Sequence, residues 1–315
     1  MISQSAPSAP ISGAVPVMPT IFDDEGELDL AGQRRVIDHL IEAEVDGICV
    51  HANYSEQFSL TDGERQQVLD LVGSHAAGRI PFFVTTSHYS TRVAVERTRA
   101  ARDAGASAVM LMPPFVGATI RAGEQEMLHY FEAVAAVGVP IMVQDAPMSP
   151  TPLPVHFLAR LAREIEEIKY VKIEVAGAAG KLRALKAAAG DALPGLFDGE
   201  EGITLIPDLA AGAVGTMCSA SVPHELGRIV RDYLAGREEQ ASEAWESLLP
   251  LIHFENRQCG PAACKVLLKE GGVIGSDAMR APWPALHPDT RAALVRLARS
   301  RGVFALSRAT QGADA

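Results

Sequence analysis

One lysine stands in an apolar segment where a charged side chain is costly to bury. Lys172 lies between Val171 and Ile173, and Glu174 follows it by two positions, which places both side chains on one face of a strand. Such a lysine either pairs with an acid or loses its proton, and a neutral amine attacks a ketone to form a Schiff base. We predict Lys172 as the nucleophile and Glu174 as its proton partner or the catalytic base. The alternatives are a lysine whose ammonium reaches water and a purely structural ion pair.

Polar side chains follow several other apolar segments. The polar strings are His51–Glu56, Thr85–Tyr89, Gln144–Asp145 and Asp198–Glu201. A single polar string after a strand is common in turns. Several polar strings that converge at the same end of a sheet or barrel indicate a binding site for a polar ligand. His88 is as consistent with a loop histidine as with a substrate-binding one. Since no HxH, HExxH or Asp-x-Asp spacing occurs, we expect no metal site.

The order of the segments predicts the fold that positions these residues. Eight apolar segments alternate with helical patterns such as Leu30–Glu42 and Thr61–Leu71. The segments are Ala14–Met18, Gly47–His51, Pro81–Thr86, Ala108–Met112, Pro140–Gln144, Tyr170–Glu174, Gly195–Asp198 and Gly212–Met217. This alternation is typical of an α/β protein of the (β/α)8 TIM-barrel class, whose reacting groups lie at the carboxyl ends of the strands. A doubly wound sheet is the alternative, but neither GxGxxG nor a Walker sequence is present.

The pattern divides the chain into four parts. Residues 1–12 are polar and rich in Pro and Ser, which predicts a flexible lead-in, and residues 13–224 form the predicted barrel. Residues 225–305 form a helical C-terminal appendage, and residues 306–315 a loose tail. The expected helices of the appendage are Glu225–Leu234, Glu238–Leu251, Ala262–Lys269 and Thr290–Ser300.

Composition narrows the classes of partner and the compartment. The chain has 315 residues, 48% of them hydrophobic, and a net charge of −11 without a basic run, so we expect no nucleic-acid partner. No apolar run is long enough for a membrane helix, and the N-terminus lacks a signal-peptide pattern. The four cysteines form no CxxC pair, and Cys49 and Cys218 lie in apolar segments, which predicts buried thiols and a reducing cytoplasm.

The chain resembles the dihydrodipicolinate synthase / N-acetylneuraminate lyase family of class I aldolase barrels over about residues 13–300. The strings that carry the resemblance are Val15–Phe22 with Gly26, Asp46–Ile48 leading to Ser55 and Glu56, Ser90 and Thr91, Pro147, Lys172–Glu174 and Gly212–Gly215. The resemblance implies that Lys172 is the Schiff-base lysine, that no organic cofactor is needed, and that the protein is a homo-oligomer, a tetramer or a dimer of dimers.

Two departures from the family pattern bear on the reaction. Gln144–Pro147 stands where the family has Tyr-Asn-x-Pro, so the proton-shuttling phenol is missing. A second relay tyrosine, expected at Phe115 or Val116, is missing as well. An amide cannot titrate at neutral pH, so Gln144 should orient the substrate. A condensation or retro-aldol reaction through the tyrosine relay is therefore not expected.

A subset of the family shares these departures. The strings Ala52–Phe58, Thr85–Thr91, Met142–Pro147, Asp198–Glu201, Glu255–Gln258 and Gly271–Ile274 are similar to those of dehydratases of 2-keto-3-deoxypentonates such as L-2-keto-3-deoxyarabonate. The resemblance implies a hydro-lyase that eliminates water from a 2-keto-3-deoxy sugar acid. The alternatives are an aldolase that releases pyruvate through the same imine and a barrel that only binds a keto acid.

The resemblance also implies roles for the remaining candidates. Ser55, with backbone N–H groups of the Asn53–Ser55 turn, would bind the substrate carboxylate, and His88 or Tyr89 would assist the departing hydroxyl. Asp198 and Glu200 would bind distal hydroxyls, although Asp198 is equally suited to cap a helix. Gly215, in the eighth strand, is expected beside the substrate. The candidate set is Lys172, Glu174, His88 and Tyr89 for catalysis, with Asn53, Tyr54, Ser55, Gln144, Asp198, Glu200 and Gly215 for substrate binding.

Overall fold

The strands of the protein form a parallel barrel. The computed structural model describes residues 10–116 and 120–307, and in that part eight strands run in the order β1-β10-β9-β8-β7-β4-β3-β2. Their bounds are β1 (Gly13–Ala14), β2 (Ile48–Val50), β3 (Phe82–Thr85), β4 (Ala108–Leu111), β7 (Ile141–Asp145), β8 (Ile168–Ile173), β9 (Gly195–Asp198) and β10 (Gly215–Thr216). Val17 bridges Cys49 on one side and Ser219 on the other, which closes the ring. The barrel prediction is confirmed, and each strand lies within or across a predicted segment.

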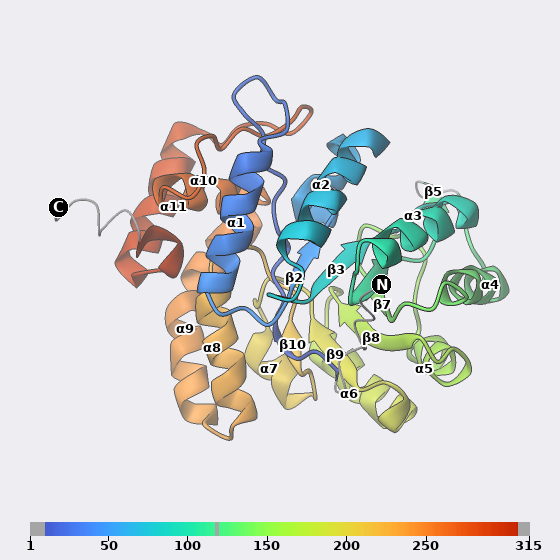
Figure 1. Cartoon of the computed structure of the whole chain (residues 1–315). Helices are drawn as coiled ribbons and strands as arrows, with labels where there is room; N and C mark the ends of the chain where they lie inside the picture. The colour runs from blue at the N-terminus through green and yellow to red at the C-terminus, as the bar shows by residue number, and fades with distance from the viewer. Residues whose placement is uncertain (1–9, 117–119, 308–315) are drawn as a thin grey trace.

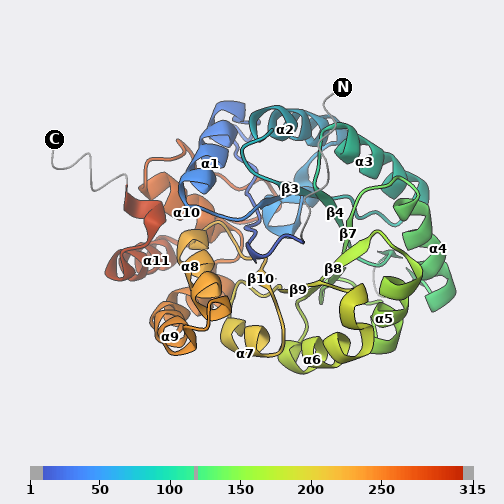
Figure 2. The same ribbon diagram turned by 60° about the horizontal axis from the view of Figure 1, so that its bottom comes forward.

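Helices surround the strands on the outside, as Figure 2 shows. They are α1 (Leu30–Glu42), α2 (Asp62–His75), α3 (Thr91–Asp103), α4 (Glu124–Ala135), α5 (Val155–Glu164), α6 (Ala178–Ala189), α7 (Leu205–Ala210) and α8 (Pro223–Leu234). Local signals set their ends: α2 begins with a capping box, in which Thr61 accepts from the Glu64 backbone at 3.2 Å and Glu64 accepts from the Thr61 backbone at 2.8 Å. Asp29 caps α1 by accepting from Gly32 N at 2.7 Å.

The C-terminal helices pack together on one side of the barrel (Figure 1). They are α9 (Glu238–Phe254), α10 (Ala262–Glu270) and α11 (Pro288–Arg301), with a π-helical turn at Glu255–Cys259 between α9 and α10. Helix α8 contacts β1 and β10 as well as α9, so it completes the ring and joins it to the appendage. The predicted boundary at residue 224 falls inside α8. The predicted tail begins at residue 306, but the described residues end at residue 307. Residues 1–9, which are most of the predicted lead-in, also lie outside the described residues.

The structure contains a short hairpin that the sequence pattern does not predict. Strands β5 (Phe115–Val116) and β6 (Ile120–Arg121) pair antiparallel after β4. Short 3₁₀ turns at Asn53–Ser55 and Gln57–Ser59 follow β2. These irregular segments stand at the carboxyl end of the barrel, where they border the cavities described below.

Side chains alternate between the barrel interior and the helices. In β8, Val171 and Ile173 pack into the outer core against the helices, whereas Tyr170 belongs to the inner cluster with Phe83, Phe197 and other buried residues. Because strand residues two apart share a face, Lys172 points the same way as Tyr170, one step nearer the carboxyl end. Lys172 therefore lies in the barrel interior, nearer the carboxyl end than the buried aromatic and aliphatic side chains of the inner cluster.

The cysteines agree with the prediction of buried thiols. Cys49, Cys218, Cys259 and Cys264 are all buried and unpaired with one another. Burial raises the pKa of Cys49 to about 11, which keeps it a neutral thiol. In the part of the chain that the structure describes, no helix is long and apolar enough to cross a membrane.

Candidate active site

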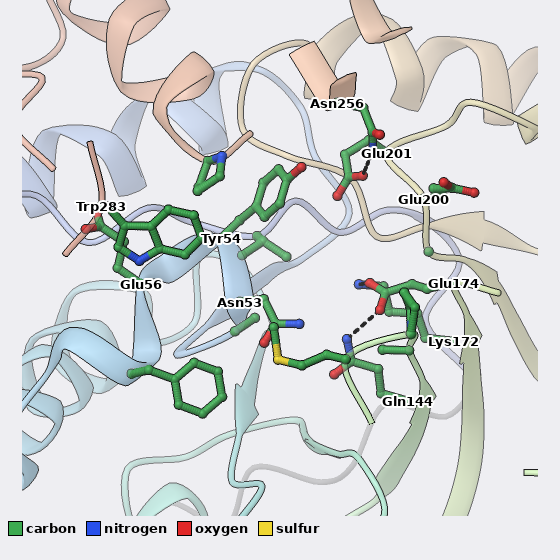
Figure 3. Close-up of a pocket in the computed structure, with 18 of the residues that line it drawn as sticks. Asn53, Tyr54, Glu56, Gln144, Lys172, Glu174, Glu200, Glu201, Asn256 and Trp283 are labelled. Carbon is green, nitrogen blue, oxygen red and sulfur yellow. Dashed lines mark hydrogen bonds and ion pairs between the residues drawn. The ribbon is translucent and has the colours of Figure 1, made fainter. Parts of the chain in front are cut away.

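A cavity of about 310 Å³ opens at the carboxyl end of the barrel (Figure 3). Strand ends, the 3₁₀ turns and the C-terminal segment contribute its walls. The polar or aromatic side chains that line it are Asn53, Tyr54, Glu56, Phe58, Gln144, Lys172, Glu174, Glu200, Glu201, Asn256, Arg257 and Trp283. The cavity is thus a concave site with several converging polar groups, which is the usual form of a small-molecule site.

Lys172 and Glu174 form a buried ion pair in this cavity. The exposed fraction is 3% for the Lys172 side chain and 13% for that of Glu174. Burial alone would lower the pKa of Lys172, but the carboxylates of Glu174 and Glu201 raise it, and the net direction is upward. The first of the two expected outcomes therefore holds, since the lysine reaches an acidic partner. The two side chains are in direct contact, so a proton could pass between them without an intervening group.

Two neighbours hold this pair in place. Gln144 lies beside Lys172 in the β7–β8 register and donates from Nε2 to Glu174 Oε2 at 2.9 Å. Gly199 packs directly on the pair: a Cβ there would lie 2.5 Å from Glu174 Cγ and 2.8 Å from Lys172 Cε. Only a glycine lets the Lys172 stem pass this close to the backbone.

A second carboxylate, Glu201, faces the same cavity from the loop after β9. Its Oε2 accepts from Asn256 Nδ2 at 2.7 Å (Figure 3). Burial raises the pKa of Glu201 well above its ordinary value, Lys172 lowers it, and Glu174 and Glu255 raise it further. Sequence reasoning gave no role to Glu201 or Asn256, although both lie in strings that resemble the dehydratases. The two residues lie 55 positions apart in the sequence, so no local sequence pattern predicts their contact.

Glu255 lies behind this wall and is fully enclosed. It accepts from the hydroxyls of Ser219 and Ser221, the latter at 2.9 Å. Burial raises the pKa of Glu255 to about 7, and the two hydroxyl donors only partly oppose this. It begins the π-helical turn that also carries Asn256, so the turn joins the buried carboxyl to the cavity wall.

A second buried lysine–glutamate pair supports the opposite wall. Lys265 of α10 contacts Glu56, and Lys265 Nζ also donates to the Ala278 carbonyl at 2.9 Å. The other Glu56 oxygen accepts from Arg280 N at 2.9 Å. Phe22 lies under both cations, 4.5 Å from Lys265 Nζ and 4.2 Å from the Arg280 guanidinium carbon. This network fixes the segment that brings Trp283 to the cavity.

The predicted site residues fall into three groups. Lys172, Glu174, Asn53, Tyr54, Gln144 and Glu200 line the one cavity. Burial raises the pKa of Tyr54, which keeps its phenol protonated, and Glu200 pairs with Arg257 at 3.3 Å.

Ser55, Asp198 and Gly215 lie behind the cavity wall. Ser55 Oγ donates to the Met18 carbonyl at 2.7 Å and accepts from Ala52 N at 3.2 Å, which fixes the turn after β2. Asp198 is buried and accepts from Thr216 Oγ1 at 2.5 Å and from Gly202 N at 3.1 Å. It thereby shapes the loop that carries Glu200 and Glu201. A Cβ on Gly215 would lie 2.3 Å from the Gly13 carbonyl oxygen.

His88 and Tyr89 line a neighbouring hollow of about 560 Å³. Phe58 and Met148 border both this hollow and the cavity of Lys172. Burial and Arg97 lower the pKa of His88, which favours the neutral imidazole, and its Nδ1 accepts from Ser90 N at 3.0 Å. The structure therefore brings these two residues beside the Lys172 cavity and not into its lining.

The site has no metal-binding cluster in the described ranges, residues 10–116 and 120–307. There, no three His, Cys, Asp or Glu side chains are arranged to hold an ion. The polar groups of the cavity are instead the Lys172 ammonium, the Arg257 guanidinium, the Tyr54 phenol, several carboxyls and the amides of Asn53, Gln144 and Asn256. This set can transfer protons and bind a polar acid.

Comparison with known proteins identifies the family of the chain. The model of the dihydrodipicolinate synthetase family matches residues 10–300. An L-2-keto-3-deoxyarabonate dehydratase from Azospirillum brasilense is 50% identical over 95% of this chain and 96% of its own. A 4-hydroxy-tetrahydrodipicolinate synthase from Synechococcus sp. (strain WH7803) is 31% identical over 90% of this chain and 93% of its own.

Solved structures give the same result for the fold. The 4-hydroxy-tetrahydrodipicolinate synthase from Methylacidiphilum fumariolicum SolV superimposes with a TM-score of 0.84 at 25% identity, over 93% of this chain and 97% of its own. The family match covers nearly the whole barrel and its appendage. The chain belongs to the dihydrodipicolinate synthetase family.

Proposed function

We propose that this protein is a Schiff-base-forming hydro-lyase that converts L-2-keto-3-deoxyarabonate into 2-oxoglutarate semialdehyde. The observation that carries the proposal is the buried Lys172–Glu174 pair at the carboxyl end of the barrel, with Gln144 where the aldolase pattern has a tyrosine. The dehydratase from A. brasilense, 50% identical over nearly its full length, supports the same reaction class and substrate.

The first stage is imine formation. Glu174 takes a proton from the Lys172 ammonium, and the neutral amine attacks C2 of the keto acid. Glu174 then gives this proton to the C2 oxygen and passes it a second proton from the nitrogen of the addition product, so the oxygen leaves as water and an iminium joins Lys172 to C2. The direct contact between the two side chains supports this transfer without a relay. The positive iminium nitrogen acidifies the C3 protons.

The second stage is elimination. Glu174, again a carboxylate, removes a C3 proton, and the resulting enamine expels the C4 hydroxyl as water. Tautomerisation and hydrolysis release the product and free Lys172. General acid and base groups each contribute about 10²–10⁴-fold to such steps. His88 and Tyr89 are the residues predicted to assist the departing hydroxyl, and from the neighbouring hollow they would reach only a substrate that extends past Phe58 and Met148.

The remaining lining residues suit a small hydroxylated acid. Asn53, Tyr54 and the turn held by Ser55 would bind the carboxylate, and Gln144 would orient the imine. Glu200 would bind a distal hydroxyl, while Asp198 would act through the loop it braces. Gly215 would act by allowing β10 to pack closely between its neighbours. The chain's own lysine supplies the electron sink, so no organic cofactor is invoked.

Product analysis tests the proposal. Incubation with L-2-keto-3-deoxyarabonate should yield 2-oxoglutarate semialdehyde, and borohydride added during turnover should leave a mass adduct on Lys172. Pyruvate as the main product would instead establish the aldolase alternative. The absence of both an adduct and turnover would leave a keto-acid-binding barrel.

We also propose a cytoplasmic location and a homo-oligomer, a tetramer or a dimer of dimers. Four free buried thiols support a reducing compartment. Phe58, Tyr89 and Met148 are exposed apolar side chains around the neighbouring hollow, and a second copy could cover them. Light scattering of the purified chain measures the assembly, and a monomeric mass at micromolar concentration would contradict it.

A further inference from the structure

We propose that Glu201 is the catalytic acid that donates a proton to the C4 hydroxyl as it leaves, with Asn256 as the positioning residue that aims it. This inference rests on the proposed dehydration and deepens it. Elimination of hydroxide is slow unless the oxygen is protonated, so a dehydratase needs an acid on the wall opposite its base. The sequence predicts His88 or Tyr89 for this role, but both line the neighbouring hollow, and the relatives' names assign no acid.

The first support is geometric. Glu201 and the Lys172–Glu174 pair line one cavity, and in Figure 3 Glu201 lies above the pair while Gln144 lies below it. A substrate carbon chain bonded to Lys172 would thus have Glu174 near one end and Glu201 farther along. Glu201 has a positive backbone φ of 52°, in the left-handed region that costs a non-glycine residue free energy, so the loop holds it in a constrained conformation.

The second support is the hydrogen bonding of the carboxyl. Asn256 donates to Oε2 at 2.7 Å. Among the described residues, Oε1 of Glu201 has no hydrogen-bond partner, so it is free to carry a proton toward a ligand. Gln144 and Lys172 engage both oxygens of Glu174 in contrast, which suits an ionised base. Two carboxyls in one cavity therefore have different environments, as an acid and base pair requires.

The third support is electrostatic. Burial raises the pKa of Glu201, and although Lys172 opposes this, Glu174 and Glu255 add negative charge that raises it further. The net direction is well above the ordinary value, so burial favours the protonated carboxyl that a proton donor requires. The iminium nitrogen at Lys172 carries the same positive charge as the ammonium that it replaces. The charge around Glu201 is therefore unchanged at the step in which Glu201 donates its proton.

The proton count closes over one turnover. When the C4–O bond breaks, the enamine electron pair forms the C3–C4 double bond, Glu174 holds the C3 proton, and Glu201 has given its proton to the water. Glu201, now a carboxylate, removes a proton from C5, and Glu174 returns its proton to C3. The resulting C4–C5 enol ketonises to the aldehyde, so both carboxyls regain their starting forms without an oxidant or reductant.

The test separates proton removal from water loss. In D₂O, the Glu201→Gln variant should still exchange the C3 hydrogens of L-2-keto-3-deoxyarabonate and still give the borohydride adduct on Lys172. Its kcat for dehydration should fall about 10²–10⁴-fold, because the amide keeps the Asn256 contact but cannot donate a proton. The 4-fluoro analogue should restore elimination to within about tenfold of the wild type, since fluoride needs far less help from an acid.

Three controls make the outcome decisive. Glu225→Gln, at a buried carboxyl of α8 whose pKa burial also raises, should leave kcat unchanged. Asn256→Ala should lower kcat less than Glu201→Gln and alter the alkaline limb of the pH profile. If Glu201→Gln raises KM at unchanged kcat, or if exchange and elimination fall together, Glu201 is not the acid. Failure of the wild type itself to dehydrate or form the adduct would overturn the proposed function instead.

Discussion

Two buried lysine–glutamate pairs lie on opposite walls of the same barrel mouth, and they differ in what surrounds them. Lys265 and Glu56 have exposed fractions of 1% and 0%, and backbone groups of Ala278 and Arg280 occupy their remaining positions. Lys172 and Glu174 face an open cavity. The ammonium of the first pair is enclosed by the protein, whereas that of the second faces a cavity with room for a ligand.

The comparison favours access to the cavity over pKa as the basis for proposing Lys172 as the nucleophile. Burial lowers the pKa of Lys265 despite Glu56, whereas nearby carboxylates raise that of Lys172. By pKa alone Lys265 would be the more reactive amine. It does not line the cavity, however, and its ammonium already has Glu56, a carbonyl and the Phe22 ring as partners. Lys172 has a base in contact and space for a ketone.

The largest effect should come from removing the open amine. Lys172→Arg keeps a cation beside Glu174 but cannot form an imine, so we expect kcat to fall on the order of 10⁴-fold or more, as when other covalent nucleophiles are removed. Activity assays and mass spectrometry after borohydride check this. Retention of turnover would break the distinction between the two lysines.

The closed pair should matter for stability instead. Lys265→Met leaves Glu56 as an unpaired buried carboxylate, which typically costs about 3–5 kcal/mol of unfolding free energy. The folded fraction at low temperature should still form the borohydride adduct on Lys172. Chemical denaturation measures the loss, and the double variant with Glu56→Gln should recover much of it. A stable Lys265→Met protein that loses the adduct would reverse the roles we assign.

Glu255 extends the comparison, because it is a buried carboxyl group that has no lysine partner among the described residues. In the described part of the chain, Glu255 forms no ion pair, and burial raises its pKa from 4.5 to about 7. Between these values the native state binds the extra proton, so unfolding free energy should fall as pH rises from 4.5 to about 7, by up to about 3 kcal/mol. Glu255→Gln should remove this slope. Denaturation at several pH values checks it, and an unchanged slope would contradict the pKa.

Much of the fold could be predicted from the sequence because its signals are local. The helix at Leu30–Glu42 was bounded correctly, and all eight strand segments were found, since apolar runs and amphipathic periods reflect each element's own burial. The short β5–β6 hairpin was missed, because Phe115–Val116 and Ile120–Arg121 are too brief to show a period.

The site was predictable only where chemistry and strand position coincide. Lys172, Glu174 and Gln144 lie on adjacent strand ends, so alternation along β7 and β8 already orders them. The contacts of Asn256 with Glu201 and of Lys265 with Glu56 span 55 and 209 positions. Such contacts follow from how the appendage packs on the barrel, which no local pattern encodes. For the same reason the sequence could not direct His88 and Tyr89 to the neighbouring hollow.

The smallest expected effect sharpens the comparison without changing any charge. Gly199→Ala adds a methyl group where only 2.5–2.8 Å separates it from Glu174 and Lys172, so the open pair must shift. Misplacement of a reacting group by about 1 Å can cost 10²-fold in rate, and we expect kcat to fall by about that factor. Gly180→Ala in α6, where a Cβ meets nothing within 4 Å, is the matched control and should be neutral. Steady-state kinetics compares the two, and equal rates would mean that the close packing of Gly199 on Lys172 does not position the amine.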